Sequence, residues 1–494
     1  MKNFLRTIIP VLLVLAMCFG VGYMLGWGVG RLLGKKQTVV VLSTNDMHAA
    51  IDNFPRLATA VAQCRDSVAT VLVDAGDRWT GNAFVDMAAE PRRPIIDLMN
   101  AIGYDVVTLG NHEFDSGAPY LDKMMSLLDS RVVCANLVSS DTAKFRQTEP
   151  YAVVVPEHNA RKLDVELGFL GVVTNYGNNN HPDGNDESFA GLLFPDPQQT
   201  AADYYERLRE ECDLPIVLSH MGDDRDSEFA KKFADYPLII GGHTHREMCD
   251  TINGVRIVQT GKNLKNIGVT VLRFKGKKLR SMEYRNVPLA TYAADPVFEA
   301  KVREIKSAPE LLAPVGEVPS ALDKVGLASL VNGAIKRSAK VDIAIYHYGG
   351  IRLDNLAKGG ISKADIYTLE PFSSQIYTMR MTPRQLEAMI VAKYNDTKNA
   401  KESHRIDLFM SEPYTILTDS NDEAYAVVFP TLKADKQYRV AMGDYIYKNY
   451  EAVEAQEVER DVALLTDALI DFARSSHIAQ VSNKKLQSVR MTQK

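Results

Sequence analysis

Leu109-Gly110-Asn111-His112-Glu113-Phe114-Asp115 lies at the end of the apolar run Val106 to Leu109. A strand that stops at glycine and then presents Asn-His points two adjacent side chains in different directions. One of them can hold a metal while the other, His112, faces a substrate, and Asp115 is close enough in sequence to orient His112. The alternative is a strand-to-helix turn in which an Asn or Asp caps the helix.

The same pattern of an apolar strand followed by polar residues occurs on both sides of this segment. The strands are expected at residues 38–44, 68–73, 106–109, 132–136, 214–218 and 238–240, and the first helices at 56–63 and 94–102. This alternation predicts an α/β fold, in which functional sites lie at the carboxyl ends of the strands.

Histidines and aspartates recur at these strand ends. Asp46 and His48 follow the first strand, and His243 and His245 follow the last. Because side chains two apart in an extended segment share a face, Asp46 and His48 are expected to hold one ion together, and His243 and His245 are expected to lie on one side of their segment. A single histidine at a strand end is more often a packed residue. Five of them, with His112 and His220, favour a metal site.

Five motifs in order, NDMH, GDRWTGN, GNHEFD, LSHMGDD and GGHTH, resemble the metallophosphatase domain of the 5'-nucleotidase and UDP-sugar hydrolase family. The resemblance covers roughly Gln37 to Val287, and Asn82 stands where many members have Ser. It implies a four-layer β-sandwich flanked by helices, followed by a second, α+β substrate-specificity domain. It also implies a hydrolase that acts on small phosphoesters.

The resemblance further implies a site with two divalent ions. The first would be held by Asp46, His48, Asp77 and His245, and the second by Asp77, Asn111, His220 and His243, so that Asp77 bridges them. His112 and Asp115 would be the catalytic pair. Mixed oxygen and nitrogen ligands suit Zn, Mn, Fe or Co.

The C-terminal part resembles the family's specificity domain. His347-Tyr348-Gly349-Gly350-Ile351-Arg352 is similar to the family's N-x-G-G-I-R loop, with His347 in place of Asn. The resemblance implies substrate binding by Arg352, Phe372 and Tyr445. Two features depart from the family. Residues 449–453 replace a G-G-D-G-[FY] segment, in which Glu451 can stand in for the missing carboxylate, and no arginine occurs near Asp323 and Lys324.

The N-terminus carries 24 residues without charge, Thr7 to Gly30, between Arg6 and Arg31. A helix of about 20 apolar residues crosses a bilayer, so we expect a signal anchor that attaches the protein to the membrane with its body facing the periplasm or the cell exterior. A cleaved signal is the alternative. The expected organisation is residues 1–36 for this segment, 37–293 for the catalytic domain, 294–312 for an interdomain helix or linker, and 313–494 for the C-terminal domain. Within the linker, Asp295 to Leu312 is expected to form an amphipathic helix.

Composition sets the class of partner. The chain has 494 residues with 46% hydrophobic and 24% charged residues, which is typical of a globular protein. Its net charge is -5, and no basic run occurs outside the N-terminus, so no nucleic acid polymer is expected as a partner. The five cysteines lie at no paired spacing and are expected to be buried free thiols, with one disulfide in the body left open.

Three functions are compatible with these features. The first is an exported, membrane-anchored phosphoesterase that acts on nucleotides. The second has the same chemistry and acts on a cyclic nucleotide or a non-nucleotide phosphoester. The third is a binding protein that contains metal without catalysis. A free His-Asp pair beside seven apparent ligands argues against the third function, because a structural ion needs neither a second metal nor a free histidine.

Overall fold

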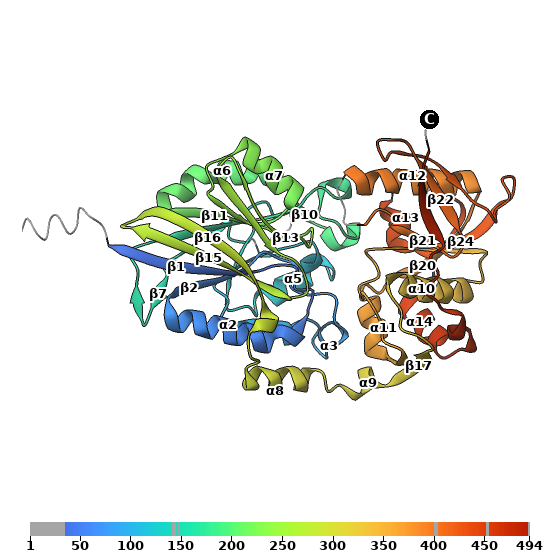
Figure 1. Cartoon of the computed structure of the whole chain (residues 1–494), viewed down its shortest axis with the longest axis horizontal. Coiled ribbons are helices and arrows are strands. Elements are labelled where there is room, and N and C mark those ends of the chain that lie inside the picture. The colour runs from blue at the N-terminus through green and yellow to red at the C-terminus, as the bar shows by residue number, and fades with distance from the viewer. Residues whose placement is uncertain (1–34, 141–144, 147, 400–403, 451–453, 493–494) are drawn as a thin grey trace, which may run out of the picture.

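The computed structural model describes residues 35–140, 145–146, 148–399, 404–450 and 454–492. The uncharged stretch of the expected signal anchor, Thr7 to Gly30, lies outside these residues, and Lys36, the last residue of the expected segment, already begins the first strand. Among the described residues, no helix has the length and apolar character that a bilayer crossing requires. The chain forms two lobes, joined along one side by α8 (Pro296–Ile305) and α9 (Pro309–Leu312) (Figure 1).

The first lobe contains two six-stranded sheets, each with a parallel centre and antiparallel strands at an edge. The first sheet has the order β16 (Lys278–Pro288), β15 (Asn266–Lys275), β1 (Lys36–Thr44), β2 (Ala69–Asp74), β3 (Val106–Thr108), β4 (Arg131–Val133). The second has the order β13 (Glu247–Ile252), β14 (Val255–Thr260), β12 (Leu238–Ile240), β11 (Leu214–His220), β9 (Leu167–Val173), β6 (Tyr151–Val154).

Strand β1 shows why the sheets are buried on both faces. Val39 and Val41 lie in the core between the two sheets, whereas Val40 and Leu42 belong to the core under the helices. A strand covered on both faces needs a continuous apolar run, which is what the sequence has. The covering helices are α2 (Phe54–Ser67), α4 (Arg93–Ile102) and α5 (Ala118–Met125) on the first sheet and α6 (Pro197–Glu211) and α7 (Asp223–Lys232) on the second.

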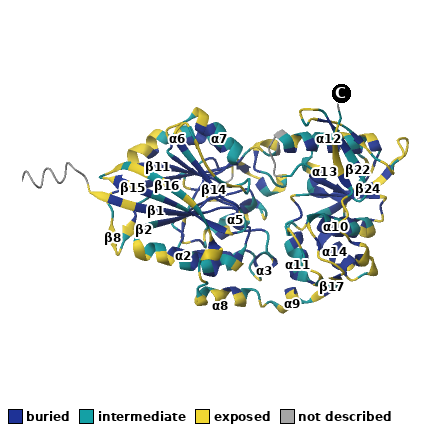
Figure 2. Cartoon of the chain, in the orientation of Figure 1, coloured by how far each residue is buried: buried dark blue, intermediate teal, exposed yellow. Residues whose placement is uncertain are grey.

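This arrangement of helix, sheet, sheet and helix confirms the expected four-layer fold. Figure 2 shows the strands buried inside, while residues on the outer surface of the helices are exposed. The short elements of this lobe are η1 (Ile51–Asn53), α3 (Ala83–Asp86), η2 (His112–Phe114), β5 (Val138–Ser139), β7 (Glu157–His158), β8 (Arg161–Lys162), η3 (Asn178–Asn180), η4 (Asp186–Phe189), β10 (Leu192–Leu193) and η5 (Leu289–Thr291).

The second lobe has a five-stranded sheet between helices, which agrees with a second domain of mixed helices and strands. The sheet has the order β21 (Leu408–Met410), β18 (Ile343–His347), β24 (Tyr438–Gly443), β20 (Gln375–Met381), β25 (Gln456–Leu464). One core lies against α10 (Lys324–Ala339), α11 (Lys363–Leu369) and α14 (Leu465–Ala473), and the other against α12 (Pro383–Asn399) and α13 (Asp444–Asn449). The remaining elements are β17 (Pro314–Val318), β19 (Gly359–Ser362), β22 (Tyr414–Thr418), β23 (Ala424–Val428), η6 (Ser476–Gln480) and β26 (Gln487–Met491).

The expectation of one helix from Asp295 to Leu312 is wrong. Asp295 caps α8 through its carboxylate, which accepts the backbone N–H of Val297 and of Phe298, but the helix ends at Ile305. A second helix, α9, begins at Pro309. Proline has no N–H to donate and disfavours helical backbone in the residue before it, so one helix cannot continue through Ala308.

The cysteines are only partly as expected. Cys64, Cys134, Cys212 and Cys249 are all free thiols, so the structure has no disulfide among them. Cys134 and Cys212 are buried and Cys64 is half-buried, but Cys249 is exposed on β13, an edge strand whose side chains largely face solvent. Cys18 lies outside the described residues.

Candidate metal centre

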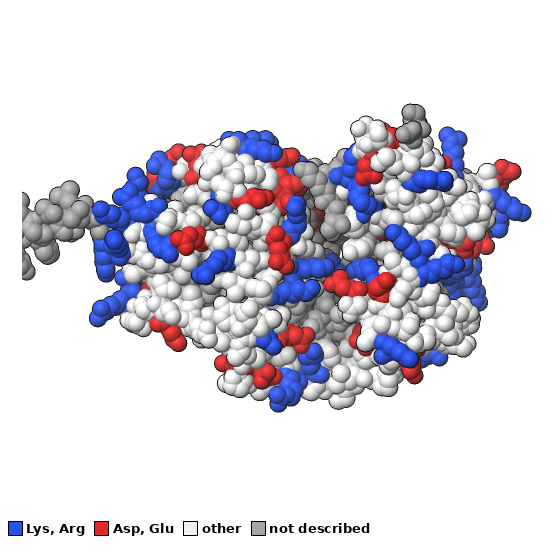
Figure 3. All heavy atoms as spheres, viewed as in Figure 1, with Lys and Arg blue, Asp and Glu red and all other residues white. Residues whose placement is uncertain are grey.

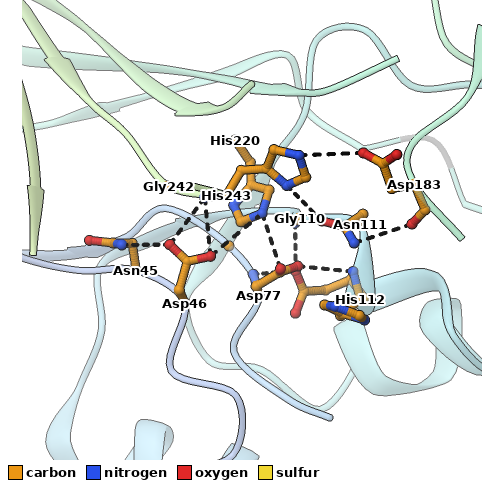
Figure 4. A network of polar contacts seen from close by, with 12 residues as sticks. Asn45, Asp46, Asp77, Gly110, Asn111, His112, Asp183, His220, Gly242 and His243 are labelled. Atoms are coloured by element: carbon orange, nitrogen blue, oxygen red, sulfur yellow. Dashed lines mark hydrogen bonds and ion pairs between the residues drawn. The ribbon is translucent and has the colours of Figure 1, made fainter. Parts of the chain in front are cut away.

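All seven predicted metal ligands meet where strands of both sheets end. Two clusters form, Asp46 with His48 and His245, and Asp77 with His220 and His243, and within each cluster the candidate ligand atoms lie within 4.8 Å of one another. Asn111 joins the second cluster because its Oδ1 is 3.1 Å from Nδ1 of His243 (Figure 4). Asp77 lies between the clusters, since it also groups with His48 and His112.

The spacing of the side chains fits cations. Nε2 of His48 is 2.9 Å from Nε2 of His245, which is 3.6 Å from Oδ1 of Asp46. Ligand atoms around one ion lie about 3–3.5 Å apart, because the metal–ligand bonds are about 2.0–2.2 Å long. In the second cluster, Nε2 of His220 is buried and makes no hydrogen bond, although it lies 3.2 Å from Oδ2 of Asp77. A buried nitrogen without a hydrogen bond beside a carboxylate is the environment expected of two ligands to a shared ion.

The geometry that pairs the ligands differs from the expected one. Asp46 and His48 have φ of 49° and 47°, and His243 and His245 have φ of 80° and 59°. These residues are left-handed, not extended, so the pairs do not share a face through strand periodicity. Left-handed backbone in non-glycine residues costs free energy and is concentrated at functional sites, where the surrounding structure holds it.

Electrostatics at the centre favours a cation. Burial lowers the pKa of His220, but the carboxylates of Asp77 and Asp46 outweigh burial and raise the pKa to about 10. Burial raises the pKa of Asp77, yet the positive charges of His220 and His112 hold it well below its usual range. Since histidine binds metal only when neutral, metal binding at this centre would release a proton.

Glycines allow the loops to approach this closely. Gly76 has a φ of +92°, and a Cβ there would lie 2.6 Å from the backbone nitrogen of Gly110. A Cβ on Gly242 would lie 2.8 Å from Nδ1 of His220. Side chains at these two positions would separate the loops that carry Asp77, Asn111 and His243.

His112 and Asp115, which the resemblance makes a catalytic pair, are in contact. Nδ1 of His112 is 3.0 Å from Oδ2 of Asp115, and the backbone N–H of His112 donates to Oδ1 of Asp77 at 2.9 Å. Burial lowers the pKa of His112, but the nearby Asp115 and Asp77 outweigh burial and raise it. The contact with Asp115 is made by Nδ1 and orients the ring, so Nε2 remains on the other side of the ring.

A buried ionic network beneath the centre was missed in the sequence. Glu113 accepts the backbone N–H groups of Asp77 at 2.8 Å, Arg78 at 2.9 Å and Gly110 at 2.5 Å, so it ties two of the ligand loops together. The fully buried Arg78 lies 3.3 Å from Asp74. Glu113 lies in the motif GNHEFD and Arg78 in GDRWTGN, so the motifs themselves were the sequence signal that could have pointed to this network.

Asp183 was also missed, and no sequence pattern pointed to it. It lies between β9 and η4, and its backbone carbonyl accepts a hydrogen bond from Nδ2 of Asn111 at 3.2 Å. Its Oδ2 lies 3.4 Å from Nε2 of His243 (Figure 4).

Two of the three predicted substrate residues reach the metal centre from the second lobe. A terminal nitrogen of Arg352 is 3.0 Å from Nδ1 of His48. The ring of Phe372 stacks on His112 at 5.6 Å, with the Arg352 guanidinium 5.6 Å from the Phe372 centroid. Tyr445 instead stacks on His347 at 5.1 Å.

The structure also shows how the Arg352 loop is held. The ammonium group of Lys324 donates to the backbone carbonyls of Ile351 and Leu353, on either side of Arg352. Burial lowers the pKa of Lys324 to about 8. Lys324 therefore holds the Arg352 loop at the position near which the sequence has no upstream arginine.

Comparison with known proteins agrees with this geometry. The sequence model described as calcineurin-like phosphoesterase matches residues 39–247, and that of the 5'-nucleotidase C-terminal domain matches residues 315–457. The chain belongs to the 5'-nucleotidase and UDP-sugar hydrolase family. Members of this family are metallophosphoesterases, so the chain is a hydrolytic enzyme.

Individual relatives within the 5'-nucleotidase and UDP-sugar hydrolase family are distant. UshA of Yersinia enterocolitica is 25% identical over 77% of this chain and 80% of its own length. The trifunctional nucleotide phosphoesterase YfkN of Bacillus subtilis is 24% identical over 83% of this chain, which spans only 32% of that protein. The structure of the 5'-nucleotidase precursor from Thermus thermophilus has a TM-score of 0.77 and 20% identity over 92% of this chain and 99% of its own. That likeness confirms the fold.

Proposed function

We propose that this chain hydrolyses the phosphate ester of nucleotides with two divalent ions, drawn from Zn, Mn, Fe or Co. The observation that carries the proposal is the meeting of Arg352 and Phe372 from one lobe with His48 and His112 from the other. An anionic group and a flat ring are the two parts of a nucleotide that a guanidinium and an aromatic side chain recognise.

The chemistry divides between the ions and the side chains. Bound ions would lower the pKa of a water molecule and offset the charge of the phosphoryl oxygens. Arg352 would hold the phosphate through its fork of donors, and Phe372 would stack on the base. His112, oriented by Asp115, would stabilise the charge that develops on the phosphoryl group or protonate the leaving oxygen.

We further propose two ligand sets. The first ion would be held by Asp46, His48, Asp77 and His245, and the second by Asp77, Asn111, His220 and His243. The proposed domain boundaries are 37–293, 294–312 and 313–494.

We also propose that residues 1–36 anchor the chain in the membrane, with the body in the periplasm or outside the cell. The support for this anchor is the uncharged segment from Thr7 to Gly30. Detection of the full-length chain in washed membranes tests it, and a soluble chain that starts beyond Gly30 would show a cleaved signal instead.

A second candidate keeps this chemistry and changes the substrate to a cyclic nucleotide or a non-nucleotide phosphoester. The altered specificity loop favours it, because His347 stands where the family loop has Asn, and its ring stacks on Tyr445 at 5.1 Å. The substrate is small in either case. Figure 3 shows acidic and basic side chains interspersed over the face in view, and a nucleic acid backbone binds best to a continuous basic track.

The test is phosphate release from a panel of substrates with each of the four metals. The panel holds nucleoside monophosphates, a cyclic nucleotide, a sugar phosphate, an oligonucleotide and p-nitrophenyl phosphate. We expect nucleoside monophosphates to have the highest kcat/KM. A higher value for the sugar phosphate or cyclic nucleotide would select the second candidate, and no release with any substrate or metal would contradict both.

Arg352→Ala tests the role of the second lobe. A hydrogen bond to a charged group contributes about 1.5–3 kcal/mol, so KM for the nucleotide should rise about 10–100-fold. KM for p-nitrophenyl phosphate should rise as well, because this ester carries the same phosphate group, whereas kcat at saturating substrate should change much less for both esters, because the catalytic His112 is retained. Arg380→Ala is the matched control, since Arg380 is an exposed residue on β20 that pairs with Glu457. A large fall in kcat at saturating substrate, for either ester, would mean that Arg352 supports the fold or the chemistry.

A further inference from the structure

Asp183 contacts two of the ligands proposed for the second ion through two different groups. Its main-chain carbonyl binds Asn111, and its carboxylate faces His243. We propose that Asp183 is a positioning residue that turns the metal-binding atoms of Asn111 and His243 toward the second ion. This role rests on the dinuclear centre of the proposed function.

The contact with Asn111 fixes which end of its amide faces the centre. An asparagine amide has a donor end and an acceptor end, and only the oxygen is a suitable ligand. Because Nδ2 donates to the Asp183 carbonyl at 3.2 Å, Oδ1 points the other way, toward Nδ1 of His243 at 3.1 Å. Figure 4 shows Asn111 between these two partners.

The contact with His243 selects a tautomer. A carboxylate 3.4 Å from Nε2 stabilises a proton on Nε2, so in the neutral ring, the form that binds metal, the lone pair is on Nδ1. Nδ1 and the Asn111 oxygen then oppose each other as two acceptors 3.1 Å apart. Two lone pairs at this distance repel unless a cation lies between them, so Asp183 prepares a site that prefers to be occupied.

The segment that carries Asp183 is held by contacts of its own. His181 stacks on Phe189 at 4.3 Å and lies 3.0 Å from Asp186, while its carbonyl accepts the N–H of Gly177. These residues do not belong to either ligand cluster. The position of Asp183 is therefore set by the fold before any ion binds.

The effect should be confined to one ion. Within the described part of the chain, the hydrogen bonds and ion pairs of Asp183 reach Asn111 and His243 and none of Asp46, His48 and His245. A residue that acts only through the general stability of the lobe would affect both sites together.

Asp183→Asn tests this, with Glu187→Gln as the matched control. Glu187 lies on the same segment with its side chain 73% exposed, and the substitution removes the same charge. The Asp183 side chain is 46% exposed, so the variant should fold, which thermal unfolding checks. The measurement is calorimetric titration of the metal-depleted full-length protein with Mn²⁺ and with Zn²⁺, followed by phosphate release over a range of metal concentrations.

We expect the affinity at one of the two sites to fall about 10–100-fold and the other to stay unchanged, with kcat recovering as the metal saturates. The control should match the wild type in both affinities. Two unchanged affinities in Asp183→Asn, or an equal fall at both sites, would overturn the positioning role alone. A wild-type chain that binds no ion would overturn the dinuclear centre and this role with it.

Discussion

Asp77→Asn is expected to reduce kcat by at least about 10³-fold, the largest loss for any single ligand. Asp77 lies between both clusters, so its carboxylate is the only one proposed to contact both ions. An asparagine keeps the shape and can still accept the N–H of His112, but it lacks the negative charge that holds two cations together. Metal ions supply several kcal/mol of transition-state stabilisation, and about 1.4 kcal/mol corresponds to a factor of ten.

The comparison that decides the role of Asp77 is with Asp46→Asn. Asp46 belongs to one cluster, so its loss should weaken one ion and reduce activity less. Both variants are measured for kcat at saturating Mn²⁺ and for thermal unfolding, because both carboxylates are buried. Equal and mild effects of the two substitutions would contradict the bridging assignment.

His112→Asn is expected to lower kcat about 10²–10⁴-fold, the usual contribution of a positioned acid or base. The metal content should stay at the wild-type value, because the ring is proposed to act on the substrate and not to bind an ion. The loss should be larger for a nucleoside monophosphate than for p-nitrophenyl phosphate, because a nitrophenolate leaves without a proton.

Asp115→Asn provides the graded control for His112. It keeps the ring but weakens the contact at Nδ1, 3.0 Å away, so activity should fall less than in His112→Asn. If His112→Asn lost an ion, the residue would be a ligand and its catalytic role would be wrong. An equal loss on both substrates would favour stabilisation of the phosphoryl charge over protonation of the leaving group.

Much of the first lobe was predictable because its strands are short apolar runs that end in polar motifs. Strand β12 has the expected bounds, Leu238–Ile240, and β1 begins only two residues before the expected strand. The seven candidate ligands could be found for the same reason, since residues at the carboxyl ends of neighbouring parallel strands meet at one edge.

The backbone at the ligands was not predictable from spacing. Asp46 and His48 were expected to share a face of an extended segment, but both are left-handed. Tertiary contacts hold this conformation, as when the His48 N–H donates to the Asp77 carbonyl at 3.0 Å. Asp183 shows the same limit, because it lies 72 residues from Asn111 and no local pattern connects them.

The second lobe was harder to interpret because its predicted residues depend on loop positions. Arg352 and Phe372 do reach the centre, but the Arg352 loop is held there by Lys324. In the sequence, Lys324 was noted only as a position near which the family's upstream arginine is absent. The stacking of Tyr445 on His347 could not be predicted without knowing that β18 pairs with β24, and these strands are about a hundred residues apart in the sequence. Glu451, suggested as a replacement carboxylate, lies outside the described residues.

The number of metal ions per chain tests the dinuclear centre itself. The full-length protein, purified without chelators and reconstituted with Mn²⁺ or Zn²⁺, is freed of excess metal and analysed by inductively coupled plasma mass spectrometry against protein concentration. We expect two ions per wild-type chain and fewer than one in Asp77→Asn. A wild-type value of one or none after reconstitution, or two ions retained in Asp77→Asn, would contradict this expectation.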